Sequence, residues 1–187
     1  VGGINLGLGM TRDYQYVGFL NDDIEVCPNW LENFFDVLDS NPDVAAVGPL
    51  TSNSRDWQGY DQARSAYNLP DLLGVNRESP VAMYEHIKNN GCGIKCSDSI
   101  SLPGSLLRRE CVDSIGLLDA SFAELYCGES KDYCWRLLEL GKLMALSMRT
   151  YFRVTPLDLD LPMSEARLNR ASAILQEKFH KTITYLD

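Results

Sequence analysis

The chain has 187 residues, of which 45% are hydrophobic and 23% are charged, and its formal net charge is −9. This composition is typical of a globular protein and excludes wholesale disorder, collagen and a coiled-coil rod. The length predicts one domain, residues 1–187, that can bury a core without disulfides or metals. Residues 1–75 hold 11 acids and 3 bases. That excess argues against nucleic acid as a partner, and it favours either a solubilising surface or a site that recruits a cation.

Membrane and metal signals are weak. No apolar run approaches the roughly 18 residues of a membrane span, so we expect no transmembrane segment. Cys92 and Cys96 are followed by no Cys/His pair with zinc-site spacing, so zinc is not expected. We expect reduced thiols and a cytoplasmic location, in solution or at the membrane surface.

The first half of the chain predicts a strand, a helix and a second strand. The apolar run 16–20 is typical of a buried strand. Asn29 can cap a helix that ends at Asn41, since apolar residues recur there at helical spacing. The run 44–48 predicts a second buried strand. This order favours an α/β fold with a mostly parallel central sheet and helices on both faces.

The second half predicts a polar excursion followed by alternating elements. Residues 51–98 are mostly polar and predict a long surface excursion, with a helix within 80–90. The elements expected after it are a strand over 99–107, helices over 109–115 and 129–140, a strand over 143–148, and a C-terminal amphipathic helix over 164–181.

The strongest chemical signal is Asn21-Asp22-Asp23, at the end of the first strand. Ligands of open α/β sheets bind beyond the carboxyl ends of strands. Two adjacent carboxylates there suit Mg²⁺ or Mn²⁺, which are held by one or two protein carboxylates together with substrate phosphates. A solvated acidic turn explains the motif equally well.

Two weaker signals follow. Glu129 and Asp132 lie three residues apart in the first turn of a helix, where either could act as a general base or simply favour the helix dipole. Gly104 would let a ligand approach the backbone closely, or would mark a bulge in a strand.

In order along the chain, these pieces resemble the nucleotide-sugar glycosyltransferases of family two, which have the GT-A fold. The resemblance runs from Asn5 to about Gly141. It rests on Asn5-Leu6-Gly7, on 16–26 with Trp30-Leu31, on 47–50, on 104–119 and on 129–137.

The resemblance implies transfer of a sugar from a nucleotide-diphosphate donor to an acceptor hydroxyl, in polysaccharide or glycoconjugate synthesis. The implied ligand is a nucleotide-diphosphate sugar, and the implied cofactor is Mn²⁺ or Mg²⁺. The implied acceptor is a saccharide or a lipid-linked molecule. Asp23 and Asp22 would bind the metal, with Asn21, Asp22 and Gly104 beside the donor and acceptor. The catalytic residues would be Glu129 and Asp132.

The sequence departs from the family pattern at three points, and the first two of them favour a rival hypothesis. Ser130 stands where the family has its aspartate base, and serine cannot accept a proton at neutral pH. Tyr151-Phe152-Arg153 occupies the place of a metal-binding histidine. The first strand–helix–strand unit of the family is also missing, so we expect an N-terminally truncated domain. The rival is a degenerate module that binds a glycan or a partner without chemistry. A receiver-like or phosphatase-like domain using Asp22 and Asp23 is a weaker alternative.

Overall fold

The computed structural model describes residues 1–52, 58–89, 93–125, 127–155 and 164–180. Within these residues the strands form one six-stranded sheet in the order β1-β5-β3-β6-β2, with β4 paired to β6 off this path. The strands are β1 (Tyr16–Phe19), β2 (Ile24–Val26), β3 (Val44–Thr51), β4 (Ile94–Ser97), β5 (Ser105–Arg108) and β6 (Leu143–Val154).

The fold class is confirmed, but the strand directions differ from the prediction of a mostly parallel sheet. Only β3 and β6 pair in parallel among the described strands, and the other pairings are antiparallel. The strand–helix–strand reasoning was right about direction, since β1 and β3 point the same way. It was wrong about adjacency, because β5 lies between β1 and β3 and runs against both. The sheet is therefore mixed.

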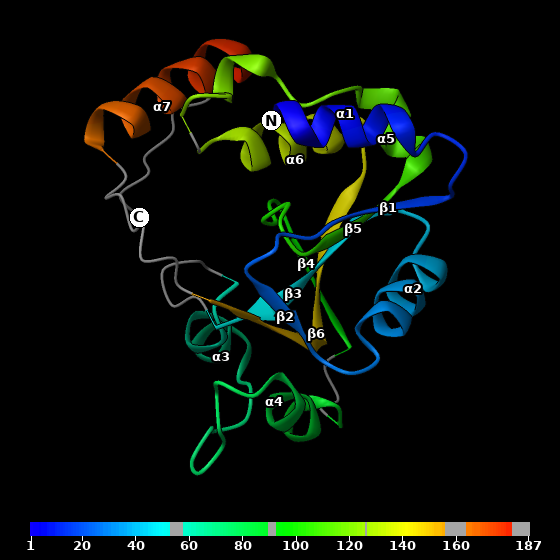
Figure 1. The fold of residues 1–187 in the computed structure, drawn as a ribbon, viewed down its shortest axis with the longest axis vertical. Coiled ribbons are helices and arrows are strands. Elements are labelled where there is room, and N and C mark those ends of the chain that lie inside the picture. The colour runs from blue at the N-terminus through cyan, green and yellow to red at the C-terminus, as the bar shows by residue number, and fades with distance from the viewer. Residues whose placement is uncertain (53–57, 90–92, 126, 156–163, 181–187) are drawn as a thin grey trace.

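Helices cover both faces of this sheet, as predicted. Ala46, Leu107 and Met144 pack on one face against α1, α5 and α6, while Val47 and Leu106 pack on the other against α2. Figure 1 shows α1, α5 and α6 gathered at one end of the molecule and α3 and α4 at the other. The helices are α1 (Gly2–Met10), α2 (Trp30–Ser40), α3 (Tyr60–Tyr67), α4 (Pro80–Ile87), α5 (Arg109–Ile115), α6 (Glu129–Glu139) and α7 (Glu165–Phe179), with a 3-10 turn at Ala120–Phe122.

Most predicted helices are confirmed to within a residue or two. The α7 helix begins after Ser164, whose side chain accepts a hydrogen bond from the Arg167 backbone, and residue 181 of the predicted range lies outside the described residues. Asn29 precedes α2, but its side chain makes no cap. Its amide donates instead to the Tyr84 hydroxyl at 2.9 Å. The stretch 51–98 contains α3, α4 and β4, so part of it packs against β3 and β6.

The predicted strand over 99–107 is shorter in the structure, because pairing starts only at Ser105. Before that point the N–H groups of Ile100, Ser101 and Leu102 bond to side chains, as described below. No helix in the described part of the chain is both long enough and apolar enough to cross a membrane.

Candidate functional site

The predicted acidic motif lies at the carboxyl end of β1. Asn21 and Asp22 are exposed, Asp23 is half-buried, and the Ile24 N–H donates to the Asn21 carbonyl at 3.4 Å to close the turn. The Asp23 carbonyl accepts a hydrogen bond from the Thr155 N–H at 2.8 Å. The turn is therefore tied to the residue that follows β6, at the end of the sheet where ligands of α/β proteins bind.

A small cavity of about 150 Å³ opens beside this turn. Its walls come from the ends of β1, β3 and β6, from the start of β2 and from the segment before β5. The lining residues are Asn21, Asp23, Ile24, Thr51, Ser101, Pro103, Phe152 and Val154. The cavity thus brings Asn21 and Asp23 beside the chain neighbours of Gly104, whereas Asp22 is not among its lining residues.

One carboxylate oxygen at the cavity has no partner. Asp23 Oδ1 is buried and makes no hydrogen bond to any described residue. Burying such an oxygen unpaired costs about 1–3 kcal/mol or more, and a bound ion or water is the usual remedy in native proteins. Among the described residues no cluster of three or more His, Cys, Asp or Glu is placed to hold a metal ion by itself. A divalent cation at Asp23 would need further oxygens, such as those of phosphates.

Gly104 lies behind the cavity wall in a conformation that favours glycine. Its φ is +81°, and its N–H donates to the Phe19 carbonyl at 2.6 Å. A Cβ at this position would lie 2.9 Å from Cδ2 of Phe152, which lines the cavity. Gly104 therefore lets the segment before β5 pass close to β1 and β6.

The first turn of α6 reaches the same wall. The Ser130 hydroxyl oxygen accepts a hydrogen bond from the Leu102 N–H at 3.2 Å, one residue from both Ser101 and Pro103. Glu129 is half-buried, and its Oε2 is buried without a hydrogen-bond partner in the described structure. Burial and, to a smaller extent, the Glu129 carboxylate raise the pKa of the nearby Cys127 thiol. Glu129 is thus a second carboxylate with an oxygen that has no partner in the described structure. It is next in the chain to Ser130, which bonds to the wall, but it is not among the residues that line the cavity.

Asp132 has a different environment. It is fully buried, with Oδ2 at 2.7 Å from Arg136 Nη2 and Oδ1 at 2.6 Å from Lys178 Nζ. The Arg136 guanidinium also donates to the Ile115 and Leu117 carbonyls, at 2.8 and 3.0 Å. Both Asp132 oxygens therefore face cations that join α6 to α5 and α7, whereas the Glu129 Oε2 is unpaired.

The place of the family's histidine is taken by β6. Phe152 and Val154 line the cavity, while Arg153 forms ion pairs with Glu78 at 2.7 Å and Glu25 at 3.5 Å. Arg153 therefore joins β2 to Glu78, two residues before α4, and its charge is already balanced.

Thr51, Ser101 and Phe152 line the cavity but were not predicted. Thr51 could have been found, because it ends the buried run of β3, and strand ends are where ligands bind. Ser101 carried no such signal, since it was assigned to a strand interior. Phe152 lay past the predicted end of β6, and the sequence marked it only as part of the stretch at the place of the family's histidine.

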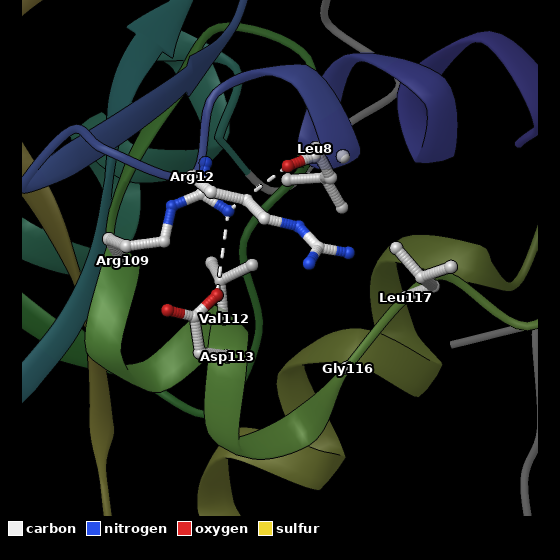
Figure 2. A pocket seen from close by; sticks show the side chains of 8 residues that line it. Leu8, Arg12, Arg109, Val112, Asp113, Gly116 and Leu117 are labelled. Atoms are coloured by element: carbon white, nitrogen blue, oxygen red, sulfur yellow. Dashed lines mark hydrogen bonds and ion pairs between the residues drawn. The ribbon is translucent and has the colours of Figure 1, made fainter.

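A larger pocket of about 390 Å³ lies at the opposite end of β1, between the end of α1 and α5. Figure 2 shows Arg109 reaching from α5 towards Leu8, with Asp113 below it, and Arg12 also lines this pocket. Arg109 donates to the Leu8 carbonyl at 3.3 Å and lies 3.6 Å from Asp113. None of the predicted site residues lines this pocket, so we place the candidate site at the smaller cavity.

Comparison with known proteins agrees with this fold. The sequence model described as Glycosyl transferase family 2 matches residues 1–102, more than half of the chain. The chain belongs to glycosyl transferase family 2. The match includes the acidic turn after β1 and ends at Leu102, within the cavity wall.

A solved structure supports the GT-A fold of this family 2 chain. The crystal structure of GalNAc-T7 with UDP, GalNAc and Mn²⁺ matches with a TM-score of 0.62 at 13% sequence identity, over 94% of this chain and 34% of that one. The chain thus spans about a third of the length of that protein. No curated protein sequence matches the chain.

Proposed function

We propose that this family 2 domain transfers a sugar from a nucleotide-diphosphate donor to an acceptor hydroxyl. The observation that carries the proposal is that two buried carboxylate oxygens, Asp23 Oδ1 and Glu129 Oε2, have no hydrogen-bond partner among the described residues. Asp23 lines the cavity, and Glu129 is next to the residue that binds its wall. The match to a protein solved with UDP, GalNAc and Mn²⁺ supports this class of donor.

Mn²⁺ or Mg²⁺ fits the donor set that the chain offers. Asp23 and the adjacent Asp22 would hold the ion through carboxylate oxygens, and the unpaired Asp23 Oδ1 is the oxygen that lacks a partner. When bound, the ion offsets negative charge on the departing diphosphate. The Asn21 amide, exposed in the cavity, can donate to or accept from the donor.

Glu129 is the proposed general base. Its carboxylate takes the proton of the acceptor hydroxyl as that oxygen bonds to the anomeric carbon, and the bond from that carbon to the diphosphate breaks. Asp132, whose carboxylate is engaged by two cations, stabilises the helix that presents Glu129. Gly104 leaves room for Phe152 beside the site.

The rival is a binding module of the same fold that holds a glycan or a partner without chemistry. Ser130 at the position of the family's base favours it, as does Arg153 at the place of the histidine. We also propose a role in polysaccharide or glycoconjugate synthesis, with a saccharide or lipid-linked acceptor. The cytoplasmic location stays a prediction.

Glu129→Gln tests the proposal against its rival. With nucleotide-diphosphate release as the assay, we expect the change to lower kcat by about 100-fold or more, because glutamine cannot accept the proton. Glu124→Gln is the matched control, since Glu124 is an exposed acid of the loop before α6. Turnover that survives both Glu129→Gln and Asp23→Ala would show that the assigned roles are wrong.

A further inference from the structure

Residues 100–102 are held through their N–H groups by side chains instead of by a neighbouring strand. The Ile100 N–H donates to Cys134 Sγ at 3.4 Å and the Leu102 N–H to Ser130 Oγ at 3.2 Å. The N–H between them, that of Ser101, donates to Gln58 Oε1. Cys134 and Ser130 are four residues apart on α6 and so lie on one face of that helix.

The side chains of this segment alternate between the core and the cavity. Ile100 and Leu102 are both 1% exposed and pack in the core cluster that includes α6. Ser101 and Pro103 line the cavity. Leu102 packs against α6, and this contact therefore fixes where its two neighbours, Ser101 and Pro103, lie in the cavity wall.

Because the Leu102 N–H points at α6, it needs a partner there. Ser130 Oγ is its partner, and removing that oxygen would leave a buried donor unpaired. The Gly104 N–H is fixed independently on the Phe19 carbonyl. Ser130 and Phe19 thus hold Leu102 and Gly104, the residues on either side of Pro103.

We propose that Ser130 is a positioning residue, whose hydroxyl holds the Leu102 backbone so that Ser101 and Pro103 form the cavity wall opposite Asp23. The inference rests on the proposed function, because it takes that cavity as the nucleotide-diphosphate site. Under this proposal the serine at the position of the family's base has a structural role: its hydroxyl accepts a hydrogen bond from the backbone, whereas the family's aspartate accepts a proton.

The first measurement is hydrogen exchange at the Leu102 amide. We expect Ser130→Ala to speed this exchange by about tenfold or more, because the amide loses its acceptor. Ser130→Thr retains the hydroxyl and should keep the wild-type rate. Ser114→Ala is the matched control, since it removes a helix hydroxyl that bonds only within α5, to the Glu110 carbonyl at 2.7 Å. An unchanged Leu102 rate in Ser130→Ala overturns the proposal.

The second measurement is calorimetry with UDP and GDP in the presence of Mn²⁺. For the nucleotide that the wild type binds, we expect Ser130→Ala to raise Kd by about tenfold, since misplaced contacts of this size weaken binding and catalysis. Ser130→Thr and Ser114→Ala should bind as the wild type does. A wild-type Kd in Ser130→Ala, with faster exchange at Leu102, overturns the positioning role alone. A wild type that binds neither nucleotide overturns the proposed function and this role with it.

Discussion

At the scale of single residues, the close approach of Gly104 to Phe152 shows how the backbone shapes the cavity. The glycine has φ of +81° and no room for a Cβ, which would lie 2.9 Å from the Phe152 ring. Left-handed backbone costs an L-residue about 1–2 kcal/mol, and forced contacts in a packed site add about 1–3 kcal/mol.

Gly104→Ala should therefore lower the free energy of unfolding by about 2–5 kcal/mol, measured by urea denaturation. Gly74→Ala is the matched control, because Gly74 has φ of +76° but nothing within 4 Å of its Cβ position. It should cost about 1 kcal/mol from strain alone. Equal losses in the two variants would contradict a contact between position 104 and Phe152.

The residue scale also shows what the sequence could and could not predict about the site. Asn21-Asp22-Asp23 was found because a buried run ends there, and strand ends carry ligand sites. The partner of Ser130 could not be found, since the hydrogen bond to Leu102 joins residues 28 apart in the chain and depends on how α6 packs. Asp132 looked like Glu129 in the sequence, and only tertiary contacts distinguish them.

At the scale of elements, α7 is joined to the rest of the fold through Lys178. Its ammonium group lies 2.9 Å from Asp119 Oδ2 and 2.6 Å from Asp132 Oδ1. The helix also packs Ala171, Leu175 and Phe179 into a core cluster with α6. The C-terminal helix therefore buttresses the element that presents Glu129.

Asp132→Asn should lower the free energy of unfolding by about 2–4 kcal/mol, because it leaves two cations around a buried neutral amide. The pH dependence of turnover should not change, since Glu129 is the proposed base. Asp113→Asn is the control, as Asp113 is an exposed partner of Arg109 at the same i,i+4 spacing, and its loss should cost less than about 1 kcal/mol. A shifted pH profile with unchanged stability in Asp132→Asn would assign the base to Asp132.

Asp119 makes stability depend on acid pH. Hydrogen bonds from the Ser121 hydroxyl and backbone N–H, and then the contact with Lys178, lower the pKa of Asp119 from 3.8 to about 2. Since the folded pKa lies below the unfolded one, this contribution is fully present above about pH 4 and is lost as the pH falls toward 2.

Because the Asp119 side chain is 30% exposed, we expect Asp119→Asn to lower the free energy of unfolding by only about 1 kcal/mol at pH 7. Urea unfolding at several pH values should show the difference from wild type shrinking between pH 4 and pH 2. A difference that stays constant over this range would contradict the assignment.

Helices with strong local signals were predicted well, and those that depend on packing were missed. The α5 helix, Arg109–Ile115, was predicted with the correct bounds. Its C-terminal end has a local signal, because Gly116, with φ of +80°, stops the helix. The α1 helix was missed because its glycines have low helix propensity. It is stabilised by burial of Leu8 and by the contacts of Ile4 with the core.

At the scale of the whole molecule, the mixed sheet explains how distant segments meet at one cavity. The β5 strand enters between β1 and β3 and so brings segment 100–104 beside the acidic turn. The sequence predicted the α/β class from local periodicity. Strand order could not be predicted in this way, because it depends on pairing between residues about 60 to 90 positions apart, such as Val47 with Leu106 and Val17 with Leu107.

The central claim is that Asp23 contributes to a site for a divalent cation and a nucleotide diphosphate. Its most direct test is calorimetry of the 187-residue chain with UDP and GDP, each with and without Mn²⁺. We expect Mn²⁺-dependent binding of one nucleotide, weakened at least about tenfold, or about 1.4 kcal/mol, by Asp23→Asn. Asp13→Asn, an exposed acid at the opposite end of β1, should bind as the wild type does. A well-folded wild type that binds neither nucleotide, or an Asp23→Asn variant with wild-type affinity, would contradict the claim.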